Sequence, residues 1–223
     1  MSDSEALSWE KSCRNHLNYA FRELSPGPDG AENTQKSEET TTPGPGHTDE
    51  KDNNVIDLAA KRQSHQEKSA KLERQANSYL DDIRIKVDFL IDTYLDRCGP
   101  GGFGKDEHSP VFEQIWDHIS LTACRYLQQR GALPDSPEVA SQEVAALLIR
   151  KQADYGHENI ARFGRIGLMV RMHDKVARLE NLHGDISGTP NNESIEDNLL
   201  DLIGYSTIGK MWEDRTFMLP LME

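Results

Sequence analysis

From Ser78 onward, apolar residues recur every three or four positions, and no segment shows the two-residue alternation of a β-strand. Glycine, proline and short polar runs separate these periodic segments, as they do at turns between helices. We therefore predict an all-α fold, a helical bundle of about five helices. The predicted helices cover about Ser78–Cys98, Pro110–Gly131, Ser136–Gly156, Glu158–Leu182 and Ser194–Trp212.

Two of these helices carry features that the fold can test directly. The third has clear end signals, because Ser136-Pro137 is typical of a helix N-terminus and Gly156 of a C-terminus. The fourth has an apolar stripe that we expect to face the core. Its members are Ile160, Phe163, Gly167, Val170, Leu179 and Leu182.

The N-terminal part of the chain has a different composition. Ser8–Leu24 has the periodicity of a short amphipathic helix, which we place in the tail. Ser25–Asn54 is rich in Pro, Gly, Ser, Thr and acidic residues and is predicted to be a disordered linker. We predict a tail and acidic linker over 1–76, a helical pair over 77–135 and a helical domain over 136–223. Residues up to about Gln75 are then dispensable for the fold.

Charge and cysteine usage exclude several classes of protein. The formal net charge of -13 argues against non-specific nucleic-acid binding, which requires clustered Lys and Arg. No segment has the run of about 18 apolar residues that a membrane span needs. The three cysteines are widely spaced, so neither disulfides nor a structural zinc is expected. We predict a cytoplasmic protein without a membrane partner, and the sequence leaves open whether it forms a homo-oligomer.

A glycine-rich segment looks like a phosphate-binding loop but lacks its context. Gly99–Lys105 fits the first seven positions of the G-x-x-x-x-G-K pattern. However, Asp106 stands where the hydroxyl that binds Mg²⁺ should be, and a predicted helix precedes the loop instead of a strand. We interpret the segment as a connector between helices.

Acidic residues on the last two predicted helices lie among apolar ones, where a carboxylate is costly unless it is paired or binds a cation. If these helices pack antiparallel, Asp174 can face Asp197 and Asp201. Carboxylate oxygens suit Mg²⁺ or Mn²⁺. We therefore predict a metal site at these three residues, with Asp174 and Asp201 as the catalytic carboxylates.

Each of these acids also has a structural interpretation. Asp197 completes a capping box with Ser194. Asp174 is one turn from Arg171 and Arg178, so it fits a salt bridge within its helix. Asp201 fits a solvated helix edge. These alternatives stay open at the level of the sequence.

Basic and polar residues near these acids are candidate substrate ligands. Arg171, Lys175 and Arg178 lie one turn apart on one helix and are suited to phosphate oxygens. Tyr205 is one turn after Asp201 on a shared helix face. The turn around Gly156 presents further donors and acceptors for a base or sugar. They are Asp154, Tyr155, His157 and Asn159.

Three ordered motifs resemble the nucleotide modification associated domain 1 family, found largely in bacteriophages and bacteria. They are Lys151–Asn159, then Arg171-x-x-Asp174-Lys175-x-x-Arg178-Leu179-x-Asn181-Leu182, then Asn192-Glu193-Ser194-x-x-Asp197-x-x-x-Asp201-Leu202-x-Gly204-Tyr205. The resemblance covers about Val144–Leu221. It implies a role in nucleotide or DNA base modification.

A looser resemblance runs to the MazG-like all-α nucleotide pyrophosphohydrolases, which hold Mg²⁺ with two pairs of carboxylates on consecutive helices. The matching stretches here are Asp174-x-x-Ala177 and Asn198-x-x-Asp201, so each pair keeps one carboxylate. The leading expectation is a metal-dependent enzyme that cleaves a phosphoanhydride of a (deoxy)nucleoside phosphate. The alternative is a non-catalytic module that binds a nucleotide or a protein, with Asp174 and Asp201 as salt-bridge anchors.

Overall fold

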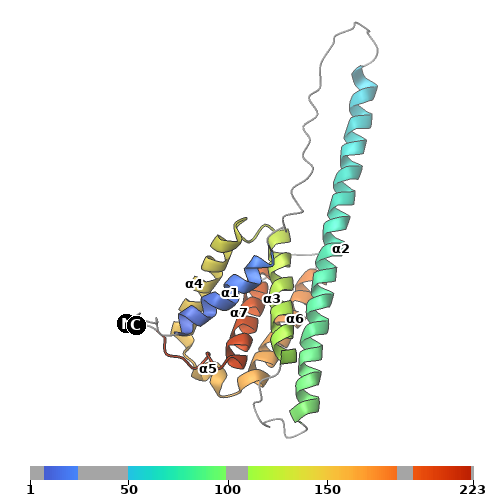
Figure 1. Ribbon diagram of the computed structural model, residues 1–223. Helices are drawn as coiled ribbons and strands as arrows, with labels where there is room; N and C mark the ends of the chain where they lie inside the picture. The colour runs from blue at the N-terminus through green and yellow to red at the C-terminus, as the bar shows by residue number, and fades with distance from the viewer. Residues whose placement is uncertain (1–7, 25–49, 99–109, 185–192, 222–223) are drawn as a thin grey trace. The chain divides into compact units, whose positions relative to one another are not determined.

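The computed structural model describes residues 8–24, 50–98, 110–184 and 193–221, with the side chains of 50–60 left out (Figure 1). All the regular elements in these ranges are helices, which confirms the all-α prediction. There are seven helices in the described ranges, against about five expected. They are α1 (Trp9–Arg22), α2 (Glu50–Cys98), α3 (Pro110–Gln129), α4 (Pro137–Tyr155), α5 (Glu158–Ala161), α6 (Gly164–Gly184) and α7 (Ile195–Glu213).

The chain divides into two compact units. One comprises Met1–Ser25 and Ser78–Glu223, and the other comprises Pro26–Asn77. The predicted linker lies outside the described residues except for its last five positions, which are helical. The glycine-rich segment Gly99–Lys105 also lies outside them. Among the described residues, no helix combines the length and apolar character required to cross a bilayer.

Local signals determine the ends of α4 as the sequence predicts. The Oγ of Ser136 accepts a hydrogen bond from the backbone N–H of Val139 at 3.4 Å, and Pro137 occupies the first turn. At the other end Gly156 is the C-cap and donates its N–H to the carbonyl of Gln152 at 2.8 Å. The prediction for this helix is therefore confirmed.

The fourth predicted helix is interrupted, which changes the face that it buries. It forms α5 and α6, and Gly164 between them has a φ of 52°, in the left-handed region that favours glycine. Phe163 and Val170 are consequently more than half exposed, so this part of the predicted stripe is wrong. The prediction is confirmed for Ile160 and Leu179, which are buried, but α6 otherwise buries residues outside the predicted stripe. Its buried apolar residues are Leu168, Met169, Met172, Val176 and Leu179.

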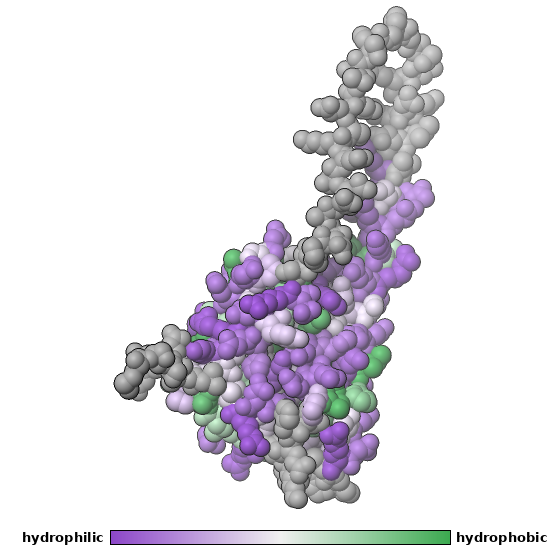
Figure 2. All heavy atoms as spheres, in the orientation of Figure 1, coloured by the Kyte–Doolittle hydropathy of each residue, from purple (hydrophilic) through white to green (hydrophobic). Residues whose placement is uncertain are grey.

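Helix α7 lies at the centre of the first unit. It packs against α3, α6 and α1, and Figure 1 shows α1 crossing in front of it. Buried residues occur all around α7 and include apolar and polar side chains as well as two glycines, as expected for a helix covered on several sides. Figure 2 shows that the bundle surface on the same side is mostly hydrophilic, with small scattered hydrophobic patches. The core is thus built around α7.

Helix α1 belongs to this bundle, which differs from its predicted place in the tail. Its apolar residues are almost completely buried and contact α4, α7 and α3. They are Trp9, Cys13, Leu17, Ala20 and Phe21. Burial raises the pKa of the Cys13 thiol to about 12, as expected in an apolar site. The spacing of apolar residues predicts this helix, but its docking depends on side chains far along the chain.

The C-terminal part of α2 is tied to α3 and α6 by polar contacts. Arg84 donates Nε to Oε1 of Glu180 at 2.7 Å and Nη2 to Oε2 at 2.5 Å. Asp82 lies 2.8 Å from both Nε2 of His118 and Oγ1 of Thr122. Beneath these contacts, Leu80, Ile83, Val87 and Leu90 are buried. This segment of α2 therefore completes one side of the bundle.

The close packing of α7 on α3 yields a stability prediction at Gly209. A Cβ at this position would lie 2.5 Å from Cδ2 of the buried Trp116. We expect Gly209→Ala to lower the free energy of unfolding by about 1–3 kcal/mol, because a buried indole cannot move away without repacking. Thermal and urea unfolding measure the change.

The matched control is Gly204→Ala on the same helix. There the nearest atom to an added Cβ is Cδ2 of Leu148 at 2.6 Å, the far end of a flexible side chain. This side chain can change rotamer, so the control should lose less stability than Gly209→Ala. Equal losses, or a more stable Gly209→Ala protein, would show that Trp116 does not pack against α7 at this point.

Candidate functional site

Two adjoining cavities lie among α4, α5, α6 and α7, and we call them together the cleft. The larger lobe is about 520 Å³ and is lined by Arg171, Asp174, Lys175, Ala177, Arg178, Asn181, Glu193 and Tyr205. The smaller lobe is about 330 Å³ and also reaches α4 and α5. Four residues line both lobes, so the two are continuous. They are Arg171, Lys175, Glu193 and Tyr205.

The cationic side of the cleft comes from one face of α6. Arg171, Lys175 and Arg178 are four and three residues apart, a spacing that places them in one row along a helix. All three are only partly exposed and line the larger lobe. The sequence predicted this grouping, and the structure brings these cations to the same cavity.

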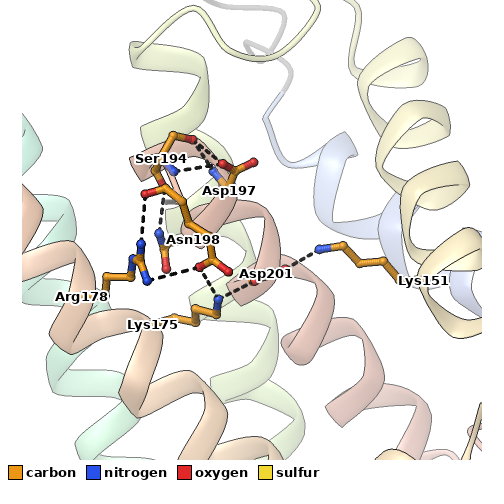
Figure 3. Close-up of polar contacts among 8 residues, drawn as sticks. Lys151, Lys175, Arg178, Ser194, Asp197, Asn198 and Asp201 are labelled. Carbon is orange, nitrogen blue, oxygen red and sulfur yellow. Dashed lines mark hydrogen bonds and ion pairs between the residues drawn. The ribbon is translucent and has the colours of Figure 1, made fainter. Parts of the chain in front are cut away.

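Asp201 lies between two lysines from different helices (Figure 3). Its Oδ1 accepts from Nζ of Lys151 on α4 at 2.5 Å, and its Oδ2 is 2.8 Å from Nζ of Lys175 on α6. Lys175 also donates to Oε2 of Glu193 at 2.7 Å. Burial lowers the pKa of the Lys175 ammonium, but its hydrogen bonds to Asp201 and Glu193 outweigh burial and raise the pKa above its ordinary value.

Arg171 and Arg178 make fewer close contacts with carboxylates than Lys175 does. Arg171 donates from Nη2 to Oδ1 of Asn159 at 2.7 Å. Arg178 approaches Glu193 through a 3.5 Å contact with its carbonyl and a 3.9 Å contact with its carboxylate. Its buried Nε has no hydrogen-bond partner among the described residues. Arg178 therefore retains donor capacity for a ligand.

Asp197 has the structural role that the sequence offered as an alternative. Its Oδ2 accepts from the backbone N–H of Ser194 at 2.9 Å and from the hydroxyl of Ser194 at 2.8 Å (Figure 3). The backbone hydrogen bond and then the hydroxyl lower the pKa of Asp197. The capping box is present in full, and Asp197 does not line the described walls of the cleft.

The three predicted metal ligands do not gather at one point. In the part of the chain that the structure describes, no group of three or more His, Cys, Asp or Glu residues is arranged to hold a metal ion. Successive residues of an α-helix point about 100° apart, and here Lys175, not its neighbour Asp174, contacts Asp201. Asp174 is exposed at the wall of the larger lobe. As arranged, these carboxylates do not fit a shared Mg²⁺ or Mn²⁺, and a metal site remains a prediction.

The predicted ligands around Gly156 divide into two groups. Tyr155 and Asn159 line the smaller lobe. Asp154 is exposed and is not among its described lining residues. His157 packs edge-on against Phe217, with ring centroids 5.3 Å apart, and is not among the described lining residues of either lobe. Neither Asp154 nor His157 is therefore brought to the cleft.

Four polar or charged residues of the described cleft walls were not among the predicted site residues, namely Lys151, Gln152, Asn181 and Glu193. Gln152 carries a usable sequence signal, because it continues the four-residue row of Val144 and Leu148, both buried. A polar residue in such an apolar row needs a partner. Lys151 has no comparable signal, since its contact with Asp201 depends on the packing of α4 against α7.

Comparisons with models of protein families, with curated proteins and with solved structures find no match to this chain. The resemblance to the nucleotide modification associated family therefore rests on the three sequence motifs. Residues from each motif line the cleft, and Lys151, Lys175 and Asp201 link the motifs through ion pairs.

Proposed function

We propose that the cleft binds a nucleoside phosphate, with its phosphate groups against Arg171, Lys175 and Arg178. The observation that carries the proposal is the row of three cations on α6 along a cavity of about 520 Å³. Guanidinium groups match phosphate oxygens through paired N–H donors, and an ammonium adds a compact charge. A nucleotide can occupy both lobes, with its phosphates in the larger lobe and its sugar and base extending into the adjoining smaller lobe.

The charges of the cleft favour an anionic ligand although the chain as a whole does not. Among the described lining residues of the two lobes, four are cationic and three are carboxylates, whereas the whole chain has a formal net charge of -13. Glu193 and Asp201 currently neutralise Lys175. A phosphate that displaces the Glu193 carboxylate replaces one ion pair by others, so the exchange does not leave a buried charge alone.

The proposal concerns binding, and turnover is the step that the family resemblance adds. Metal-dependent hydrolysis would require Asp201 to exchange its lysine partners for a cation, because both of its oxygens are engaged. Incubation with a panel of ribo- and deoxynucleoside triphosphates in Mg²⁺ or Mn²⁺ tests this step directly. Product that forms in the parent but not in Asp201→Asn supports an enzyme, and nucleotide binding without product supports the non-catalytic module.

We expect Arg178→Lys to weaken nucleotide binding by about 1–3 kcal/mol, because lysine keeps the charge but loses the paired N–H donors. Stability should change little, because the contacts of Arg178 with Glu193 are long and partly exposed. Calorimetric titration with a nucleoside triphosphate and thermal unfolding measure the two effects on one variant.

The matched control is Arg162→Lys, an exposed arginine between α5 and α6 that does not line the described walls of the cleft. It makes the same chemical change and should leave nucleotide affinity at the parent value. An Arg178→Lys protein that is less stable but binds nucleotide normally would contradict the phosphate role of Arg178. Absence of nucleotide and inorganic phosphate binding in the parent would contradict the proposed function itself.

A further inference from the structure

The smaller lobe contains a buried amide with an unused donor. Gln152 on α4 is 4% exposed and lines this lobe. Its Nε2 has no hydrogen-bond partner among the described residues. Buried amide groups are nearly always hydrogen-bonded in folded proteins, and an orphaned one destabilises the fold. A donor of this kind at the wall of a cavity indicates a ligand that supplies the acceptor.

The other walls of the smaller lobe suit a flat ring. Leu148, Ile160 and Ile208 contribute apolar surface, and Tyr155 and Tyr205 contribute aromatic side chains. The charged groups of this lobe are the Lys151–Asp201 ion pair and three residues, Arg171, Lys175 and Glu193, that also line the larger lobe. Apolar and aromatic walls combined with a few placed polar groups, here including a buried amide, are the usual composition of a small-molecule site.

We infer that the smaller lobe is the base subsite of the cleft and that Gln152 selects the nucleobase by hydrogen bonding to its polar edge. This inference rests on the proposed function, since the phosphates on α6 fix which lobe the base can enter. The Nε2 of Gln152 donates to a carbonyl oxygen or ring nitrogen of the base, and the amide oxygen can accept from a neighbouring N–H. A primary amide can thus read two adjacent atoms of one base edge.

The test is Gln152→Met in the full chain, a change that keeps the length of the side chain and removes both polar atoms. Isothermal titration of the common ribo- and deoxynucleoside monophosphates should show at least a roughly tenfold loss of affinity for the preferred base. The differences in affinity between nucleotides with different bases should become smaller. Two ligands without a base, inorganic tripolyphosphate and deoxyribose 5-phosphate, should bind the variant as they bind the parent.

Stability is the readout that separates recognition from a structural role. If the amide of Gln152 is hydrogen-bonded only when a ligand is present, the ligand-free Gln152→Met protein should melt at or above the temperature of the parent, because the substitution removes an unpaired buried donor. The control is Ser206→Ala on α7, which removes a buried hydroxyl that likewise has no described partner but is not among the described lining residues of the cleft. Ser206→Ala should leave the base preference unchanged.

Each failure identifies which statement is wrong. If Gln152→Met keeps the parent's affinities and base preference while tripolyphosphate still binds, the base subsite is wrong and the phosphate site stands. If deoxyribose 5-phosphate loses affinity as much as the nucleotides do, Gln152 holds the sugar and the base inference is overturned. If neither nucleotides nor tripolyphosphate bind the parent, the proposed function fails, and the inference fails with it.

Discussion

Arg165→Met is expected to lower the free energy of unfolding by about 3–5 kcal/mol, because it leaves the carboxylate of Glu213 buried without its main partner. The side chains of Arg165 and Glu213 are 4% and 0% exposed. Arg165 donates Nε to Oε1 at 2.7 Å and Nη2 to Oε2 at 2.6 Å, and so joins the start of α6 to the end of α7. Urea unfolding at neutral pH measures the loss.

Two further variants give this prediction its control. Arg84→Met breaks a pair with the same paired geometry, Arg84 with Glu180, but their side chains are 21% and 45% exposed. Water can solvate the carboxylate that remains, so the cost should be at most about 1 kcal/mol. The double variant Arg165→Met with Glu213→Leu removes the buried charge and should recover much of the loss.

The outcome that contradicts the buried pair is a double variant less stable than Arg165→Met alone. It would mean that Glu213 has other partners that matter more, such as Trp116, whose Nε1 lies 3.4 Å from Oε1 of Glu213. Nucleotide binding should be retained in every variant that folds, because neither Arg165 nor Glu213 lines the described walls of the cleft.

The helices could be predicted where their ends depend on local chemistry. The hydroxyls of Ser136 and Ser194 cap helices α4 and α7 with groups only three residues away. The break before Gly164 was missed, because the apolar spacing of Ile160 and Phe163 continues across it. Helical periodicity predicts which apolar residues share a face only if the helix is continuous, and an interruption changes which of them do.

The candidate site shows the same division. The row of Arg171, Lys175 and Arg178 could be predicted because spacing along one helix determines which side chains share a face. The facing of α6 and α7 could not be predicted, because it depends on the rotation of each helix about its axis. Lys175 occupies the place beside Asp201 that the sequence interpretation gave to Asp174.

Trp9→Ala is expected to destabilise the bundle by about 3–5 kcal/mol, the usual cost of truncating a large aromatic side chain in a core. Trp9 is 0% exposed at the first position of α1, and its backbone N–H contacts the carbonyl of Pro220 at 3.4 Å. The two ends of the described chain therefore meet at this residue. Thermal unfolding monitored by far-UV circular dichroism, which reports helix content and not tryptophan fluorescence, measures the loss.

The control on the same helix is Tyr19→Ala, because Tyr19 is 55% exposed and its ring centroid lies 4.9 Å from Nζ of Lys210 at the bundle surface. A cation–π contact contributes about 0.5–2 kcal/mol, so the control should lose less than Trp9→Ala. If both variants melt like the parent, α1 does not dock on the bundle. A chain that begins at Asn77 should then unfold at the same temperature as the full chain, as the composition of the N-terminal region alone predicts. If only Trp9→Ala is destabilised, such a shortened chain loses a core helix and should unfold at a lower temperature.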